Sequence, residues 1–389
     1  MPSPAGTHVL TLTPFYPSRD DERGGYVAEP LGEFGALGLF SSVVAVRPLH
    51  KGSVLESKNA VPASWLCYPA FPGNLGLASA GRLLFLRLRS RVRRLHRENP
   101  IDILHAHAAL PCGEAARLLG EELGIPFVVT VHGLDAYLTE QVRGAAGARC
   151  EAVCRFVYEQ AGRVICISEQ VRRQVLAGAP ELQNTAVVYN GVDPEAFFPA
   201  TSPAEDGGVV SVGSLIPIKG HDVTLRALAE LRVEFPHLRA RIVGEGLELG
   251  RLQTLARQLG IGERVDFLGR QRRAQVAELL RGSQIFALPS RYEGLGVSYL
   301  EAMASGLPVI AYRGQGIQEV IRHGESGILV TEQTVEAAPR AWAAVLRTLL
   351  RSEEKRRAMG LAARRTVKEA YTVRHQAQAL SRIYEECRA

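Results

Sequence analysis

The stretch that decides the fold runs from Leu288 to Ala311 and reads LPSRYEGLGVSYLEAMASGLPVIA. It carries two glutamates eight positions apart, Glu293 and Glu301, with a glycine-rich turn between them. The apolar run that begins at Ile285 has the composition of a buried parallel strand, and VSYLEAMA after Gly296 predicts a short helix. A glycine loop that leads into a helix exposes backbone N–H groups at the positive end of the helix dipole. This order of elements therefore predicts a phosphate site.

The two glutamates extend that prediction from a phosphate to a larger ligand. A carboxylate inside the helix, Glu301, can accept hydrogen bonds from a ribose diol, and a carboxylate on the loop, Glu293, can face a sugar. A phosphate site beside one carboxylate suited to a ribose and another suited to a sugar predicts a nucleotide-sugar pocket. The alternative is that both are solvated surface carboxylates.

Short β-rich runs alternate with helical stretches along most of the chain. This alternation predicts parallel sheets with helices on both faces. We expect strands at 8–13, 42–46, 102–105, 127–131, 163–167 and 186–189, and after a linker at 209–212, 240–243, 264–268, 285–288, 308–311 and 327–330. Ligands of such sheets bind beyond the carboxyl ends of the strands, so motifs that directly follow a strand are candidates for a site.

Composition narrows the class of protein. The 389 residues are too many for one ordinary core and suit two domains. No apolar run approaches the roughly 18 residues of a spanning helix, and the N-terminus lacks the pattern of a signal peptide. The six cysteines form no CxxC pair, which favours reduced, packed thiols. A net charge of +6 is compatible with nucleic acid, anionic lipid or an anionic substrate and selects none of them.

Four further motifs precede the glutamate pair. They are Gly24-Gly25, His132-Gly133-Leu134-Asp135, Asn190-Gly191-Val192-Asp193 and Gly213-Ser214-Leu215-Ile216-Pro217-Ile218-Lys219-Gly220. With the glutamate segment, the series resembles the retaining GT-B glycosyltransferases of family GT4. Those enzymes carry a GG loop, H-G-x-x-D, N-G-V-D, G-R-x-x-x-x-K-G and E-x7-E in this order. The resemblance runs from about Thr11 to about Val330.

The resemblance implies an α/β fold of the GT-B type, with two Rossmann-like doubly wound parallel-sheet domains facing across a cleft. We expect an acceptor-binding domain at 1–199 and a nucleotide-sugar-binding domain at 200–370, because the composition shifts to Pro, Gly, Ser and acidic residues at 199–208. A final helix at 371–389 is expected to cross back to the first domain. Transfer of a hexosyl unit from a donor such as a UDP-sugar, with retention and with neither cofactor nor metal, is also implied.

The resemblance assigns roles within the glutamate segment. Glu301 is expected to hold the ribose, and Glu293 to face the donor sugar as a catalytic residue. The backbone N–H groups of Gly294, Leu295 and Gly296 are expected to contact the donor. Leu295 stands where the family usually has an aromatic residue, which changes the local packing.

Lys219 is expected to neutralise the donor diphosphate as the leaving group departs. The family usually pairs this lysine with an arginine five residues earlier. This chain has Ser214 there, which we expect to bind the donor in its place. The departure removes a bidentate phosphate partner, which Arg291 or Arg313 can replace only if the fold brings one of them near.

The first half supplies histidines and glycines. His132 follows a predicted strand, and by resemblance it contacts the donor sugar as a catalytic residue. Asp135 is expected to orient His132 or to bind acceptor. Two histidines in an H-x-H pattern, His105 and His107, lack a third metal ligand at suitable spacing, so we interpret them as cleft-lining or structural.

The Gly24-Gly25 loop is expected to approach the donor phosphates and the acceptor closely, which requires glycine. The chain has no G-x-G-x-x-G string there, and this argues against a nicotinamide site.

A basic amphipathic helix is predicted over 81–99, with Leu84 and Leu88 on the apolar face and Arg87, Arg91 and Arg94 flanking it. An ordinary sheet-covering helix whose arginines reach water is one interpretation. Docking to an anionic membrane that carries a lipid-linked acceptor is the other.

The resemblance implies a glycosyltransferase of bacterial surface-polysaccharide or lipopolysaccharide synthesis that acts on a glycan or lipid-linked acceptor. We expect a cytoplasmic protein, at most peripheral at the inner face of the membrane, with no nucleic-acid partner. Two alternatives stay open, a sugar-nucleotide epimerase or hydrolase of the same fold, and a catalytically silent scaffold that binds nucleotide-sugar.

Overall fold

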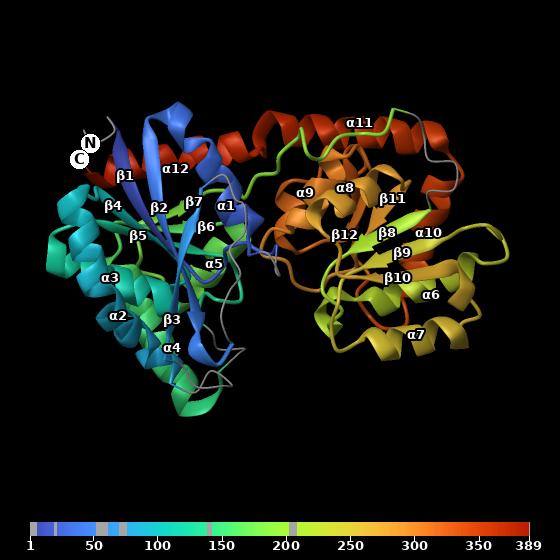
Figure 1. Ribbon diagram of the computed structural model, residues 1–389. Helices are drawn as coiled ribbons and strands as arrows, with labels where there is room; N and C mark the ends of the chain where they lie inside the picture. The colour runs from blue at the N-terminus through green and yellow to red at the C-terminus, as the bar shows by residue number, and fades with distance from the viewer. Residues whose placement is uncertain are drawn as a thin grey trace. The chain divides into compact units, whose positions relative to one another are not determined.

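The computed structural model describes residues 6–18, 22–51, 61–69, 76–137, 142–201 and 208–388. The chain forms two compact units, Met1–Asn190 with Val373–Ala389, and Gly191–Thr372 (Figure 1). We had expected the divisions near 199/200 and 370/371. The first lies earlier because the segment after Asn190 packs within the second unit. There the ring of Phe197 is fully buried, and the Arg364 guanidinium donates to its carbonyl oxygen over 3.0 Å.

The first unit is built on a seven-stranded parallel sheet with the order β3-β2-β1-β4-β5-β6-β7. Its strands are β1 (Thr7–Thr13), β2 (Leu39–Pro48), β3 (Ala63–Tyr68), β4 (Ile103–His107), β5 (Phe127–Val131), β6 (Arg163–Cys166) and β7 (Thr185–Val187). Successive strands run outward from β1 in one direction and from β4 in the other. The sheet therefore has its topological switch point between β1 and β4.

Helices cover both faces of this sheet (Figure 1). They are α1 (Gly25–Gly32), α2 (Leu77–Glu98), α3 (Glu114–Leu123), α4 (Gly144–Gln160), α5 (Glu169–Gly178) and α12 (Val373–Arg388). The terminal helix α12 belongs to this unit although 182 residues of the other unit separate it from Asn190. Its Gln376 side chain donates to the carbonyl oxygen of Tyr26 (3.1 Å), and Arg388 binds the Thr7 hydroxyl (2.6 Å).

The second unit has a six-stranded parallel sheet with the order β10-β9-β8-β11-β12-β13. Its strands are β8 (Val209–Val212), β9 (Ala240–Val243), β10 (Val265–Gly269), β11 (Ile285–Ala287), β12 (Val309–Tyr312) and β13 (Gly327–Val330). Its helices are α6 (His221–Leu231), α7 (Leu249–Gln258), α8 (Arg273–Arg281), α9 (Val297–Ala304), α10 (Ala338–Leu350) and α11 (Glu353–Ala370). The switch point lies between β8 and β11.

The two doubly wound parallel sheets confirm the predicted fold class, and most predicted strands match within three residues at each end. The helix predicted after Gly296 is α9, and Ser168 caps α5 by accepting from the N–H of Val171 (3.1 Å). Strand β3 was missed although it contains a short apolar run at 65–68; it is an edge strand, and most of its residues are half-buried. Among the described residues, no helix is both long enough and apolar enough to cross a membrane.

Candidate active site

Two loops of the second unit meet at the switch point of its sheet, one after β8 and one after β11. The N–H of Arg291 donates to the carbonyl oxygen of Ile218 over 2.7 Å. Gly220 has φ +67°, and a Cβ there would lie 2.1 Å from the carbonyl oxygen of Pro289. The loops are therefore joined so closely that only glycine fits between them.

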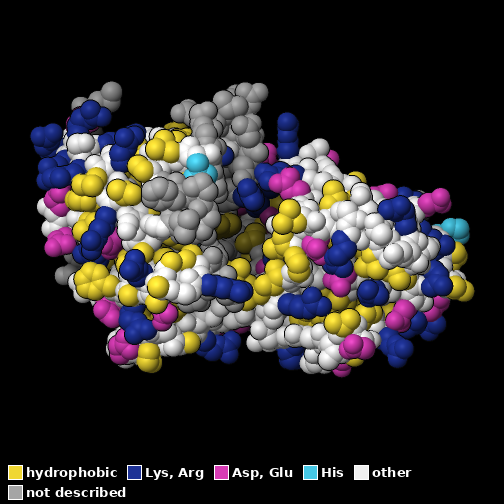
Figure 2. All heavy atoms as spheres, turned by 90° about the horizontal axis from the view of Figure 1, so that it is seen from below, with side chains coloured by type: hydrophobic (Ala, Val, Ile, Leu, Met, Phe, Trp, Pro, Cys, Tyr) yellow, Lys and Arg dark blue, Asp and Glu magenta, His cyan; other side chains and the backbone are white. Residues whose placement is uncertain are grey.

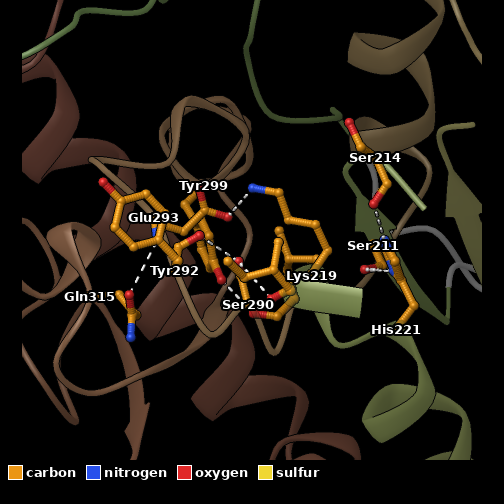
Figure 3. Close-up of polar contacts among 11 residues, drawn as sticks. Ser211, Ser214, Lys219, His221, Ser290, Tyr292, Glu293, Tyr299 and Gln315 are labelled. Atoms are coloured by element: carbon orange, nitrogen blue, oxygen red, sulfur yellow. Dashed lines mark hydrogen bonds and ion pairs between the residues drawn. The ribbon is translucent and has the colours of Figure 1, made fainter. Parts of the chain in front are cut away.

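This junction brings Lys219 to Glu293 (Figure 3). The Lys219 Nζ lies 2.7 Å from Glu293 Oε1, and the two side chains are 21% and 9% exposed. The backbone of Glu293 is held from its other side, because its N–H donates to Gln315 Oε1 (3.1 Å) and its carbonyl accepts from the N–H of Gly316 (3.0 Å). The carboxylate thus sits in a fixed position beside an ammonium group.

Gly296 begins helix α9 in a left-handed conformation (φ +91°), which favours glycine. No side chain caps this helix end, so its first N–H groups are available to an anion. The helix is anchored by Tyr299, whose buried hydroxyl donates to the carbonyl oxygen of Leu288. Leu295 is buried, so its side chain serves packing, and only the backbone at this position is left to contact a ligand.

Glu301 lies in the second turn of α9 and is buried apart from a small fraction of its side chain. Its Oε1 accepts from Arg273 Nη1 over 2.5 Å. Burial raises the pKa of the Glu301 carboxyl, and the charge and hydrogen bond of Arg273 lower it. The sequence had predicted Glu301 but not its arginine.

The side chain of Ser214 is exposed, and its backbone carbonyl makes the contact with the rest of the site. Its carbonyl oxygen lies 3.3 Å from Nε2 of His221, whose Nδ1 lies 3.2 Å from the Ser211 hydroxyl. Burial lowers the pKa of His221 to about 4, so this histidine is neutral at physiological pH. It braces the loop after β8 from within (Figure 3).

Arg291 and Arg313 are the candidate replacements for the arginine that the family usually has where this chain has Ser214. The Nη1 of Arg291 lies 3.5 Å from the carbonyl oxygen of Pro217, in the turn that carries Lys219. Arg313 is exposed, and its backbone N–H pairs with Val330 of β13. The structure therefore brings Arg291 to the Lys219 turn.

In the first unit, His132 directly follows β5. Its Nε2 lies 3.0 Å from Nδ1 of His107 at the end of β4, and the two share a hydrogen bond. The imidazole also contacts the rings of Phe15 (centroids 5.3 Å apart) and Tyr26 (5.0 Å). Phe15 follows β1 and Tyr26 opens α1, so His132 lies among elements at the switch point of this sheet.

The glycine loop lies against the backbone of Phe15. Gly24 has φ +100°, and a Cβ there would lie 2.7 Å from the carbonyl group of Phe15. Gly25 is the first residue of α1, and no side chain caps that helix. The first glycine is therefore required by close packing, and the second opens a helix beside His132.

Asp135 holds the backbone of this turn, because its Oδ1 accepts from the N–H of His132 over 2.9 Å. Burial raises the Asp135 pKa to about 6 and lowers the His132 pKa to about 3. Within the described ranges, Oδ2 of Asp135 and Nδ1 of His132 are buried without a hydrogen-bonding partner. A neutral imidazole with one uncommitted nitrogen suits contact with a polar ligand.

His105 has a different role from its neighbour His107. Its Nδ1 lies 2.7 Å from the Tyr384 hydroxyl of α12, and its Nε2 lies 2.7 Å from the Thr130 hydroxyl of β5. Both nitrogens are committed, so His105 ties α12 to the sheet. Over the part of the chain that the structure describes, no group of three or more His, Cys, Asp and Glu could hold a metal ion.

Four of the supporting residues were missed from sequence, namely Arg273, His221, Gln315 and Gly316. Arg273, Gln315 and Gly316 act through contacts with segments more than 20 positions away, whereas His221 contacts residues seven and ten positions before it. Only Gly316 left a trace, as a glycine after a predicted strand, and a Cβ there would lie 2.0 Å from the carbonyl oxygen of Gly294.

Comparison with known proteins agrees with this geometry. The family Glycosyl transferases group 1 matches residues 192–366, and Glycosyltransferase Family 4 matches residues 37–196. The D-inositol 3-phosphate glycosyltransferase of Corynebacterium urealyticum is 30% identical over 370 residues, which cover 86% of this chain and 83% of that enzyme. The chain therefore belongs to the group 1, family 4 glycosyltransferases.

Solved structures show the same fold at low sequence identity. Sucrose-phosphate synthase from Thermosynechococcus elongatus superposes with a TM-score of 0.75 at 19% identity, covering 97% of this chain and 98% of that one. HepE from Anabaena, in complex with UDP, gives 0.73 at 20% identity, covering 97% and 99%. The fold is GT-B, as the sequence motifs had predicted.

Proposed function

We propose that this glycosyltransferase moves a hexosyl unit from a nucleoside-diphosphate sugar, with UDP as the expected nucleotide, to a glycan or lipid-linked acceptor. We further propose that it retains the anomeric configuration and needs no metal ion. One observation carries the proposal. An ammonium group, two buried carboxylates and an uncapped helix N-terminus gather in the second unit, in Lys219, Glu293, Glu301 and α9.

Each part of the donor has a chemical complement there. The Glu301 carboxylate can accept both ribose hydroxyls, and the first N–H groups of α9 can bind the diphosphate with the help of the helix dipole. Lys219 adds a full positive charge. Arg291, from the loop after β11, reaches the turn that carries Lys219 and can offset part of the charge that Ser214 does not supply.

The Lys219–Glu293 pair suits the bond-breaking step. When the bond between the anomeric carbon and the diphosphate oxygen breaks, the electron pair stays on the diphosphate, where Lys219 can neutralise it. Positive charge grows on the sugar ring, as in other glycosyl transfers, and Glu293 can stabilise it. The acceptor hydroxyl oxygen forms the new bond to the anomeric carbon, and its proton passes to the departing diphosphate oxygen. Donor binding must therefore draw Lys219 away from Glu293 and toward the diphosphate.

His132 is proposed to contact a hydroxyl of the donor sugar through its uncommitted Nδ1. His107 and Asp135 hold its ring and its backbone, so they are proposed as orienting residues. The loop of Gly24 and Gly25 is proposed to approach the phosphates and the acceptor. A neutral His132 serves this role as a hydrogen-bonding group and not as a charge.

The donor is tested first, by a thermal-shift screen against UDP-, GDP- and ADP-sugars, because a ligand that binds the native state raises its apparent stability. The UDP compounds are expected to give the largest shift. Release of nucleotide that depends on an added acceptor separates transfer from hydrolysis and epimerisation, and binding without any release would identify a silent scaffold. The anomeric proton of the product, observed by NMR, decides retention, and unchanged rates in EDTA decide metal independence.

The acceptor is proposed to be a growing glycan or lipid-linked sugar of bacterial surface-polysaccharide synthesis, met at the inner face of the membrane by a cytoplasmic enzyme. Helix α2 supports this through exposed Arg87 and Arg94 and half-buried Arg91. Leu86 on the same helix is 58% exposed. Figure 2 shows Lys and Arg side chains on the first unit, among hydrophobic and acidic side chains.

Co-sedimentation with anionic vesicles tests this contact. Reversing Arg87, Arg91 and Arg94 to glutamate is expected to abolish binding, whereas reversing the exposed Lys355, Arg357 and Lys368 of α11 is expected to leave it intact. Equal loss in both triple variants would show only a general charge effect.

A further inference from the structure

Arg273 is the first residue of α8, and it reaches the carboxylate of Glu301 on α9. Its Nη1 donates to Oε1 over 2.5 Å, and the two side chains are 29% and 9% exposed. Among the described residues, Oε2 of Glu301 has no hydrogen-bonding partner. One oxygen of the carboxylate is therefore committed to the arginine, and the other is left for a ligand.

The Arg273 guanidinium also stacks on an aromatic ring. Its Cζ lies 4.7 Å from the ring centroid of Phe197, which is fully buried. Arg364 of α11 fixes the backbone of that phenylalanine by donating to its carbonyl oxygen. A planar cation can stack on a ring and donate to a carboxylate at once, whereas a lysine ammonium cannot match both contacts.

Arg273 is also the cation that pairs with the Glu301 carboxylate. Arg364 of the neighbouring helix α11 and the two charged groups of the Lys219–Glu293 pair are committed elsewhere. Arg364 is directed at backbone carbonyls, and Lys219 and Glu293 pair with each other. Across the described ranges, Arg273 makes the sole ion pair of Glu301.

We propose that Arg273 is a positioning residue for the donor ribose, which keeps Glu301 ionised and turns its free oxygen toward the two ribose hydroxyls. The inference rests on the proposed function and deepens it, because it assigns discrimination between ribonucleotides and deoxyribonucleotides to one ion pair. Without Arg273, burial alone acts on the carboxyl, whose pKa then rises further. A protonated, mobile carboxyl is a weaker and less directed acceptor for a diol.

The test compares the dissociation constants of UDP and 2′-deoxy-UDP by isothermal titration between pH 5 and pH 8. A hydrogen bond to a charged group corresponds to roughly 10- to 100-fold in affinity, so the wild type is expected to prefer UDP by about that factor. In Arg273→Gln the preference is expected to fall to about threefold or less at pH 6 and to recover in part at pH 8. Arg273→Lys, which keeps the charge, is expected to lie between the two.

Arg281 provides a matched control on the same helix. Its Cζ lies 4.4 Å from the Phe198 ring centroid, and no carboxylate among the described residues pairs with it. Arg281→Gln is expected to keep the wild-type preference at every pH. The double variant Arg273→Gln with Glu301→Gln is expected to discriminate no worse than Glu301→Gln alone, because Arg273 acts through that carboxylate.

The outcomes separate this inference from the proposed function. A wild type that binds none of UDP, GDP and ADP overturns both. The inference alone is overturned if the wild type binds UDP and the Arg273→Gln variant matches the wild type in two measurements. These are the melting temperature and the preference for UDP over 2′-deoxy-UDP at every pH from 5 to 8. An additive loss in the double variant overturns it too, because Arg273 would then contact the nucleotide independently.

Discussion

Replacing Lys219 by methionine separates a role in folding from a role in catalysis. The ammonium lies 2.7 Å from Glu293 Oε1, with 21% of one side chain and 9% of the other exposed. Exposed ion pairs contribute about 0–1 kcal/mol, and removing one partner of a fully buried pair costs about 3–5 kcal/mol. This pair is intermediate in burial, so Lys219→Met is expected to lower the free energy of unfolding by about 1–3 kcal/mol.

The loss in turnover is expected to exceed what the loss in stability would suggest. A positive group at the departing diphosphate acts on charge that grows as the bond breaks, so its effect is greatest in the transition state. Removing one such preorganised group typically reduces kcat by about 100- to 1,000-fold, or about 2.7–4 kcal/mol. We expect a reduction of that size in Lys219→Met.

Initial rates with a UDP-sugar and thermal unfolding measure the two effects on the same samples. In the double variant Lys219→Met with Glu293→Gln, no charge is left unpaired, so most of the stability should return while the rate stays low. Lys368→Met, an exposed lysine of α11, is the control and should match the wild type in both assays. A Lys219→Met enzyme with a lower melting temperature and kcat within about threefold of wild type would refute the catalytic role.

Three further substitutions test the remaining site residues. Glu301→Ala is expected to weaken UDP binding by roughly 10- to 100-fold in isothermal titration, with the exposed Glu278→Ala as control, and unchanged affinity would remove the ribose role. His132→Ala is expected to lower kcat more than it raises the dissociation constant of the donor, and wild-type turnover would count against it. Burial raises the pKa of Asp135 from 3.8 to about 6. Its bound proton therefore stabilises the folded state fully below pH 4, and up to about 3 kcal/mol of the free energy of unfolding is lost as pH rises through 6. Asp135→Asn should remove that fall, and parallel melting curves of the two proteins against pH would show that the group titrates normally.

The sequence predicted the parts of the fold that local patterns encode. Apolar runs marked the central strands, and the glycine-to-helix transition marked α9 to the residue. It missed β3, an edge strand of mostly half-buried residues whose apolar run at 65–68 is short. It also placed the boundary at the Pro-rich segment near Pro199, whereas the chain changes unit at Asn190, because Phe197 is buried by tertiary contacts that composition does not reveal.

The residues proposed to bind the donor lie in local patterns that a sequence can show. Glu293 and Glu301 sit in one local motif, and Lys219 follows a strand at a recognisable distance. Their partners were not predictable, because Arg273 lies 28 positions before Glu301, on another helix, and carries no signal that distinguishes it from neighbouring arginines. The pairing of His107 with His132 likewise depends on β4 and β5 being adjacent in the sheet.

The two site carboxylates have opposite relations to their cations, and this difference fits the roles proposed for them, Glu293 beside the donor diphosphate and Glu301 at the ribose. In the proposed reaction Glu293 shares its cation with the diphosphate, so the pair must separate when donor binds, and a flexible, compact lysine suits that exchange. Glu301 must keep its charge while it binds a neutral diol, so its cation must stay, and Arg273 is fixed by stacking on Phe197. Exchanging the two cation types would therefore impair both functions, because an arginine beside Glu293 would hold it too firmly and a lysine beside Glu301 would lose its stacking partner.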